Sequence, residues 1–219
     1  MKKSFLIAIS VIIIPVIIFF VGSAGKQNFQ HLPFWGERIE PNGIDVKDTI
    51  FYSVPDFKLT SQTGETISQK TFDNKIYIAN FFFASCKDVC PKMNAKVETV
   101  YSKIKEQKFS EIKFLSITVD PENDSVSVLS EYSKKFNADP SIWYFATGTQ
   151  QDVFKTGQGF LVPVSKEDTT IDHSQQLLLI DKEKHIRGIY NGLDEVELSR
   201  LKDEIKVLLY EYHTNQKQG

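Results

Sequence analysis

One short segment constrains the fold of this 219-residue chain more than any other: an apolar run that leads directly into two cysteines and a proline. The run, Ile76–Phe83, is short, β-branched and aromatic, which is typical of a strand buried on both faces. Cys86 and Cys90 follow it and are the two cysteines of the chain. Pro91 comes next, and proline is accepted in the first turn of a helix, where its missing N–H has no partner to lose. The segment therefore predicts a strand, a loop and a helix, with both thiols near the start of the helix.

The rest of the chain predicts an alternation of strands and helices. Strands that alternate with helices favour parallel βαβ units with right-handed crossovers. A βαβ half joined to a ββα half is the plan of the thioredoxin fold, so we expect an α/β, thioredoxin-like fold with a mixed central sheet flanked by helices. The predicted elements are two short strands (Phe57–Thr60, Glu65–Ser68), three strands that each lead into a helix (Ile76–Phe83 and Pro91–Gln107, Ile112–Val119 and Ser125–Phe136, Trp143–Ala146 and Gln150–Lys155), a hairpin (Gln176–Asp181, His185–Tyr190) and a last helix with an apolar stripe at Leu198, Leu201, Ile205 and Leu208.

The N-terminal segment predicts export to a membrane. Phe5–Val21 is apolar and uncharged, and about 17–25 such residues span a bilayer. Lys2 and Lys3 precede it, which favours a cytoplasmic N-terminus and an exported domain. We expect a single-pass anchor in a bacterial cytoplasmic (inner) membrane, with the domain on the periplasmic, extracytoplasmic side; a signal peptide cleaved near Val21–Ala24 is the alternative. The absence of cysteine near this segment rules out lipid attachment at a processed N-terminal cysteine.

Composition and these signals divide the chain into four parts: 1–24, a membrane anchor or signal peptide; 25–54, a tether; 55–212, the thioredoxin-like domain; and 213–219, a polar tail. Phe34 and Trp35, within the tether, could lie at a membrane interface or pack on the domain. The charge is balanced, with 26 basic and 28 acidic residues, and no basic block indicates nucleic acid. Two cysteines are also too few for a scaffold held together by disulfides.

The spacing of Cys86 and Cys90 suits one shared ligand. Residues four apart on a helical turn face the same side, with about 5–6 Å between their Cβ atoms, and a helix N-terminus favours thiolate over thiol. His173 precedes a second apolar run, Leu177–Ile180. Two thiolates and an imidazole suit Cu(I), and also Cu(II) in a trigonal arrangement, whereas structural zinc would want a fourth protein ligand. From the residues alone, a metal site, a dithiol redox centre and a structural disulfide all stay open.

Other candidate ligands have simpler explanations. Met93 recurs at helical spacing with Val97, so it is predicted to lie in the core. An isolated histidine near a strand is more often structural, and His173 gains weight only because a thioredoxin-like fold places the segment before the hairpin beside the active-site helix. Three further histidines are expected in the tether, at a hairpin end and in the polar C-terminus: His31, His185 and His213.

Together these motifs resemble the Sco/SenC family, membrane-anchored copper proteins used in the assembly of cytochrome c oxidase. The resemblance rests on the order and spacing of four pieces between Pro55 and Leu209: Pro55–Thr60, Cys86–Pro91, Val119–Asp124 and Asp172–Ser174. It implies that Cys86, Cys90 and His173 bind one copper ion per chain, as Cu(I) or Cu(II). It also implies that Asp120 lies near the site and orients a ligand; a turn or a helix cap before Ser125 would explain this residue equally well.

The resemblance further implies a function in copper delivery. Family members pass copper to the binuclear copper site of the oxidase or reduce the cysteines of that site. The expected partner is therefore the copper-bearing subunit of cytochrome c oxidase or another copper protein, and the chain is expected to be a metallochaperone rather than an enzyme. The alternative is an exported thiol–disulfide oxidoreductase in which Cys86 attacks and Cys90 resolves. The peroxiredoxin pattern PxxxTxxC is absent in either cysteine register, and thioredoxins carry CxxC where this chain has CxxxC.

Overall fold

The computed structural model describes residue 13 and residues 31–39, 50–162 and 175–215. The chain divides into two compact units, Met1–His31 and Leu32–Gly219, and the strands and helices reported below belong to the second. Within the described residues, no helix has both the length and the apolar character needed to cross a membrane. The anchor predicted at residues 1–24 lies, apart from Ile13, outside the described residues.

Seven strands form one mixed sheet, in the spatial order β4-β3-β7-β6-β5-β8-β9. Parallel pairing joins β5 to β6 and β6 to β7, and the other neighbouring pairs are antiparallel. A separate two-stranded sheet pairs β1 with β2. The strands are β1 (Arg38–Ile39), β2 (Ile50–Phe51), β3 (Lys58–Ser61), β4 (Thr66–Ser68), β5 (Ile76–Phe82), β6 (Ile112–Thr118), β7 (Trp143–Thr147), β8 (Gln176–Ile180) and β9 (Ile186–Asn191).

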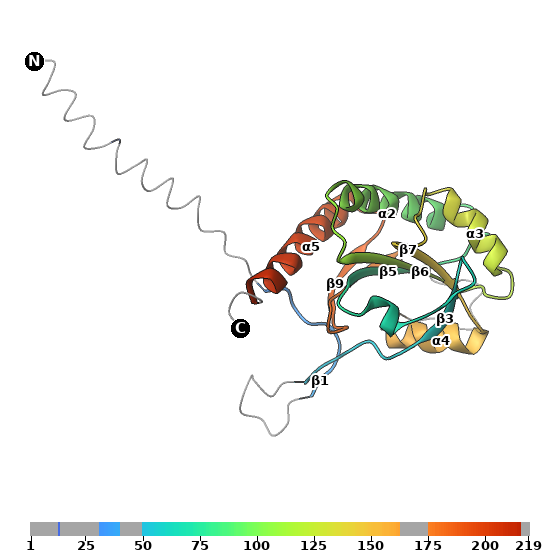
Figure 1. The fold of residues 1–219 in the computed structure, drawn as a ribbon, viewed down its shortest axis with the longest axis horizontal. Coiled ribbons are helices and arrows are strands. Elements are labelled where there is room, and N and C mark those ends of the chain that lie inside the picture. The colour runs from blue at the N-terminus through green and yellow to red at the C-terminus, as the bar shows by residue number, and fades with distance from the viewer. Residues whose placement is uncertain (1–12, 14–30, 40–49, 163–174, 216–219) are drawn as a thin grey trace, which may run out of the picture. The chain divides into compact units, whose positions relative to one another are not determined.

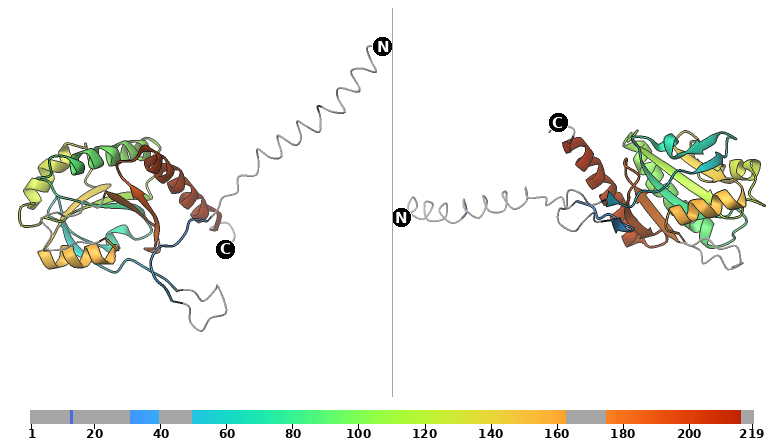
Figure 2. Two further views of the ribbon diagram at one scale, coloured as in Figure 1. Left: turned by 180° about the vertical axis from the view of Figure 1, so that it is seen from behind. Right: turned by 90° about the horizontal axis from the view of Figure 1, so that it is seen from below.

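Helices cover both faces of the large sheet. Helices α2, α3 and α5 lie on one face and α4 on the other (Figure 1), and Figure 2 shows the same division from two further sides. A separate core forms on each face: Cys90 and Leu129 belong to the first, and Val153 and Phe160 to the second. The helical elements are η2, a 3₁₀-helix (Gln69–Phe72), α2 (Val89–Glu106), α3 (Val126–Lys134), α4 (Gln150–Gly159) and α5 (Glu195–Asn215).

Strand β5 shows why the centre of the sheet is apolar at almost every position. All of its residues are buried, and side chains alternate between the two faces along a strand. Ile76 and Ile78 enter the first core, while Tyr77 and Ala79 enter the second. The continuous run that predicted this strand is therefore a consequence of cover on both faces. Because the cysteine loop follows β5 directly, both cores fix the point from which that loop departs.

The thioredoxin-like fold predicted from the sequence is confirmed: β5, α2 and β6 form the βαβ half, to which β7 adds a further parallel strand, and β8, β9 and α5 form the ββα half. Helix α4 is longer than predicted, since it continues past Lys155 to Gly159. Glycine normally weakens a helix, but a Cβ at Gly159 would lie 2.7 Å from Pro55 Cγ. The close approach of Pro55 therefore requires glycine in this last turn. Helix α5 continues through Asn215, into the segment predicted as a polar tail.

Part of the segment predicted as a tether packs on the domain. Leu32 is buried, and its carbonyl accepts a hydrogen bond from Arg187 Nη2 at 2.8 Å. Phe34 stacks on Phe51, with 3.8 Å between ring centroids, and lies 4.2 Å from the Arg187 guanidinium. The Trp35 backbone pairs with the edge of β9, while its side chain is 44% exposed. Of the two alternatives that the sequence left open for Phe34, packing on the domain is the one observed.

Candidate functional site

The two cysteines meet where β5 gives way to α2. Cys86 is half-buried in the loop 83–88, and Cys90 is buried as the second residue of α2. Both are free thiols. The loop turns back on itself, since the Cys86 N–H donates to the Phe83 carbonyl at 3.3 Å. Pro91 occupies the first turn of α2, where it sacrifices no hydrogen bond.

The Cys86 sulfur takes the place of a helix cap. Asp88 precedes the helix, but its side chain accepts no backbone N–H of the first turn and pairs instead with Lys92 at 2.5 Å. The Cys90 N–H donates to Cys86 Sγ at 3.3 Å. The first N–H groups of a helix have no acceptor within the helix, and its positive end favours an anion. The loop therefore holds the Cys86 sulfur at a position that stabilises a thiolate.

The pKa values of the two thiols are displaced in opposite directions. Burial acts to raise the pKa of Cys86, but hydrogen bonds outweigh it and the pKa is lowered. These bonds come from the backbone of Cys90, Asp88 and Val89 and from the Cys90 thiol. Burial raises the pKa of Cys90 to about 12; a backbone hydrogen bond with Phe83 opposes this rise, and the neighbouring Cys86 adds to it. The pair thus combines an accessible sulfur that ionises readily with a buried sulfur that keeps its proton.

The two thiols supply two of the three predicted copper ligands. The third, His173, lies outside the described residues, as do Asp172 and Ser174. In the ranges that the structure describes, no group of three or more His, Cys, Asp or Glu side chains could hold a metal ion. The described donors are therefore two sulfurs, which are soft ligands and suit Cu(I).

The described residues that follow this gap lie close to the first turns of α2. Strand β8 runs antiparallel to β5, so its N-terminal end points toward the end of β5 that carries the cysteine loop. A Cβ on Gly192 would meet Met93 Cγ at 2.9 Å and the Gln175 carbonyl oxygen at 3.1 Å, so these two residues lie near each other. Met93 follows Cys90 by one helical turn and is 1% exposed, which confirms that it is a core residue. The chain thus enters β8 beside the helix that holds Cys90.

The turn between β6 and α3 carries two carboxylates in different surroundings. Asp120 is half-buried, and its carboxylate accepts hydrogen bonds from Asn123 Nδ2 at 2.9 and 3.0 Å. Asp124 is 1% exposed, and its Oδ2 accepts from the Ala84 N–H at 2.9 Å and from the Thr118 hydroxyl at 2.5 Å. The carboxylate that contacts the cysteine loop is therefore that of Asp124, which was not predicted. The ligand-orienting role of Asp120 stays a prediction.

A buried chain of polar side chains fastens α2 to the sheet, and it too was not predicted from the sequence. Asn80 on β5 donates to Asn94 on α2 at 3.0 Å, and Asn94 donates to the Tyr132 hydroxyl on α3 at 3.2 Å. Ser116 on β6 donates to Asn80 at 2.7 Å and accepts from the Trp143 indole on β7 at 2.9 Å. All five side chains are buried. Because Asn94 lies one helical turn after Cys90, this network helps to fix the turn of α2 that holds Cys90.

Two further histidines of the described region, His185 and His213, have structural contacts. His185 Nδ1 lies 2.8 Å from the Tyr52 carbonyl oxygen, and its ring meets that of Phe34 edge-on. His213 Nε2 lies 3.3 Å from a Glu111 carboxylate oxygen. That neither histidine belongs to the copper site stays a prediction.

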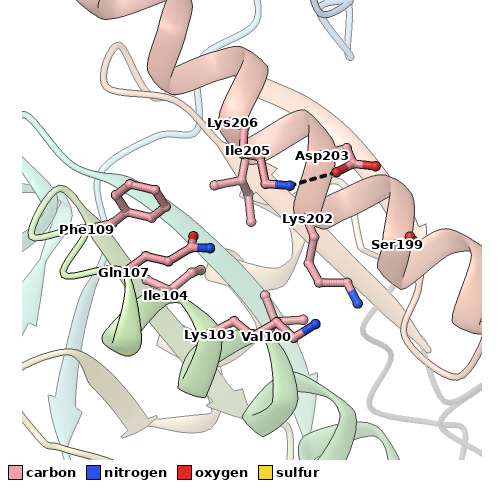
Figure 3. A pocket seen from close by; sticks show the side chains of 10 residues that line it. All are labelled: Val100, Lys103, Ile104, Gln107, Phe109, Ser199, Lys202, Asp203, Ile205 and Lys206. Atoms are coloured by element: carbon pink, nitrogen blue, oxygen red, sulfur yellow. Dashed lines mark hydrogen bonds and ion pairs between the residues drawn. The ribbon is translucent and has the colours of Figure 1, made fainter.

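A cavity of about 220 Å³ lies between α2 and α5 (Figure 3). Val100 and Ile104 of α2, together with Ile205 and Lys202 of α5, belong to its lining. Val100 follows Cys90 by ten residues. At a rise of about 1.5 Å per residue, this places Val100, the first α2 residue of the lining, about 15 Å along the helix from the buried cysteine. The cavity is therefore not part of the cysteine site.

Comparison with known proteins identifies relatives of this chain. The family model described as SCO1/SenC matches residues 50–209. The SCO1 protein homolog of Bacillus subtilis is 25% identical over 169 residues, which are 75% of this chain and 86% of that protein. Among solved structures, a SCO1/SenC family lipoprotein from Bacillus anthracis is 26% identical with a TM-score of 0.66, over 72% of this chain and 95% of that chain. Arabidopsis thaliana ScoI with copper bound is 26% identical with a TM-score of 0.62, over 74% of this chain and 99% of that chain.

Proposed function

This chain belongs to the SCO1/SenC family, and we propose that it is a membrane-anchored copper metallochaperone. In this proposal Cys86, Cys90 and His173 bind one copper ion, and the protein delivers it to the binuclear copper site of a cytochrome c oxidase. The Sco family is a family of cytochrome c oxidase assembly proteins. The partner is then the copper-bearing subunit of the oxidase.

The observation that carries the proposal is the meeting of the two cysteine sulfurs at the N-terminus of α2. Cys86 Sγ accepts the Cys90 N–H at 3.3 Å, and each thiol acts on the pKa of the other. Two soft sulfurs held this close form a chelating pair for Cu(I). The copper bound by Arabidopsis ScoI supports this choice of ion. Cys86 is partly exposed, so an incoming ligand from a recipient protein can reach the ion at that side.

The proposed third ligand draws support from the residues that follow it. His173 precedes Gln175 by two positions, and the Gln175 carbonyl lies beside Met93, one turn beyond Cys90. Two residues span at most about 7 Å of extended chain, so an imidazole at position 173 is within reach of the cysteine end of α2.

We further propose that residues 1–24 anchor the protein in the cytoplasmic membrane with the domain on the outer side. The uncharged run Phe5–Val21 after Lys2 and Lys3 supports this orientation. Protease treatment of intact spheroplasts is expected to digest the domain. Protection of the domain until the membrane is broken would contradict the orientation.

Copper titration of the full chain, reduced and held in detergent, with metal analysis after desalting, tests the copper site. We expect one tightly held copper ion per chain and none in Cys86→Ser. His173→Ala should weaken retention of Cu(II) above all, because it removes the only nitrogen ligand. His213→Ala is the matched control, since that histidine lies on α5 against Glu111. Stoichiometric copper in a Cys86→Ser, Cys90→Ser double variant would refute the site.

A thiol–disulfide reductase is the second candidate, because the displaced pKa values separate an attacking thiol from a resolving one. The Cys86 thiolate would attack a target disulfide and release one target thiolate. Cys90 would then pass its proton to that thiolate and displace the second target sulfur, closing a Cys86–Cys90 disulfide. Two electrons thus pass to the target. Steady reduction of insulin disulfides by the metal-free protein with an added thiol reductant, unchanged by His173→Ala, would favour this function.

A further inference from the structure

Asp124 is a buried carboxylate outside the proposed ligand set, and it touches the loop that carries Cys86. Only 1% of the residue is exposed. One of its oxygens, Oδ2, accepts two hydrogen bonds, from the Ala84 N–H at 2.9 Å and from the Thr118 hydroxyl at 2.5 Å. Ala84 lies two residues before Cys86, and Thr118 is the last residue of β6. A single atom therefore ties the cysteine loop to the end of the neighbouring strand.

The burial of this carboxylate calls for an explanation. A buried charge is unfavourable unless it is paired or well hydrogen-bonded. Among the described residues, both hydrogen-bond donors to the Asp124 carboxylate are neutral. The nearby Asp120 carboxylate carries a charge of the same sign and repels it. A role at the adjoining loop accounts for a carboxylate here better than a contribution to overall stability does.

The Ala84 bond joins the loop to the turn between β6 and α3, which the hydrogen bond between Cys86 and Phe83 does not. The Cys86 N–H bonds to Phe83 within the loop itself, so it shapes the loop without fixing it to the sheet. Asp124 is anchored independently, since its own N–H donates to the Asp120 carbonyl at 2.9 Å. Its contact with Ala84 therefore transmits the position of the β6–α3 turn to the loop.

We propose that Asp124 is a positioning residue: by accepting the Ala84 N–H, it holds Cys86 in the conformation in which its sulfur meets Cys90. A loop held in this way raises the effective concentration of one sulfur at the other, and so favours both chelation and disulfide closure over a loop that is free to move. Hydrogen bonding, not charge, provides the effect. Only the consequence for copper rests on the proposed function.

Asp124→Asn and Asp124→Ala separate hydrogen bonding from charge. Asparagine keeps a carbonyl oxygen that can accept from both donors but has no charge, whereas alanine has no acceptor. Val153→Ala is the control for lost stability, because it truncates a fully buried side chain in the core on the other face of the sheet. If Asp124→Ala does not fold, Asp124→Leu removes the acceptor without leaving a cavity, and the same result is expected.

The first measurement, on the full metal-free chain, is the equilibrium of the Cys86–Cys90 pair with a glutathione redox buffer. We expect Asp124→Ala to lower the equilibrium constant for disulfide formation about tenfold, a reduction potential about 30 mV more positive for this two-electron couple. Asp124→Asn and Val153→Ala should stay close to the wild type. An unchanged or more stable disulfide in folded Asp124→Ala would overturn the proposal. A shift in Asp124→Asn as large as in Asp124→Ala would also overturn it, because charge would then be the cause.

The second measurement is Cu(I) affinity, by competition with a chromophoric chelator. We expect Asp124→Ala to bind Cu(I) most weakly, and the affinities of Asp124→Asn and Val153→Ala to stay close to that of the wild type. Copper affinity that is equal in wild type and Asp124→Ala would contradict the positioning role. A wild-type chain that binds no copper would refute the proposed function alone, and the glutathione equilibrium would still decide the role of Asp124.

Discussion

The buried polar chain through Asn94 allows a stability prediction to be worked out from its contacts. Asn94→Leu preserves the approximate volume but removes the oxygen that accepts from Asn80 and the N–H that donates to Tyr132. Each buried polar group left without a partner costs about 1–3 kcal/mol. Burial of the added apolar surface offsets about 1–2 kcal/mol of the combined cost. We therefore expect a net loss of about 2–3 kcal/mol in the free energy of unfolding.

Urea unfolding followed by circular dichroism measures this loss, and a double-mutant cycle tests its cause. Tyr132→Phe removes the hydroxyl but keeps the ring that stacks on Phe82, with 5.1 Å between centroids. Alone, Tyr132→Phe should lower the free energy of unfolding by about 1–2 kcal/mol, because the Asn94 side-chain N–H loses its acceptor. In the Asn94→Leu background that donor is already gone, so the second change should cost little and the two should couple by about 1 kcal/mol or more. Losses that add to within about 0.5 kcal/mol would refute the network as a cooperative unit.

Two further predictions concern Cys86 and the packed N-terminal segment. In metal-free Cys90→Ser, alkylation of Cys86 by iodoacetamide should reach half its maximal rate below pH 9.0, the ordinary value from which its pKa is lowered, because the thiolate is the nucleophile. A midpoint at or above that value would contradict the hydrogen bonding described. Arg187→Met should destabilise the fold by about 3–5 kcal/mol, because Asp181 and Glu211, each 3.1 Å from the guanidinium, would lose their cation. Thermal unfolding measures this, and an unchanged midpoint would show that the ion pairs are not needed for stability.

The fold was largely predictable because burial on both faces leaves a local signature. Strands β5 and β6 are mostly apolar runs, and the cysteines follow the first of them at the point where a helix must begin. The polar network was hidden in those same runs. Asn80 and Ser116 are polar residues within these strands, and their partners Asn94 and Trp143 lie on other elements. No local periodicity connects residues that meet only through packing.

Asp124 shows a second limit of local patterns. Asp120 and Asp124 share one turn, and spacing alone does not tell which carboxylate faces inward. The family resemblance implied a role for Asp120, at the end of the strand. The chain turns so that Asp124, just before the helix cap Ser125, is the buried carboxylate. The packing of Leu32 against Arg187 could not be predicted from local patterns either, because the two residues are 155 positions apart.

The opposite displacement of the two thiol pKa values would make copper exchange at the proposed site a proton-coupled event. Cys90 carries a proton at any pH well below its pKa of about 12, whereas an ionised Cys86 does not. Each copper ion bound to both sulfurs would then displace one proton, so affinity would fall about tenfold for each unit of acidification. A recipient whose cysteines are already ionised would not share this proton requirement. The direction of transfer would therefore depend on the relative acidity of donor and recipient thiols, and on the pH of the compartment where they meet.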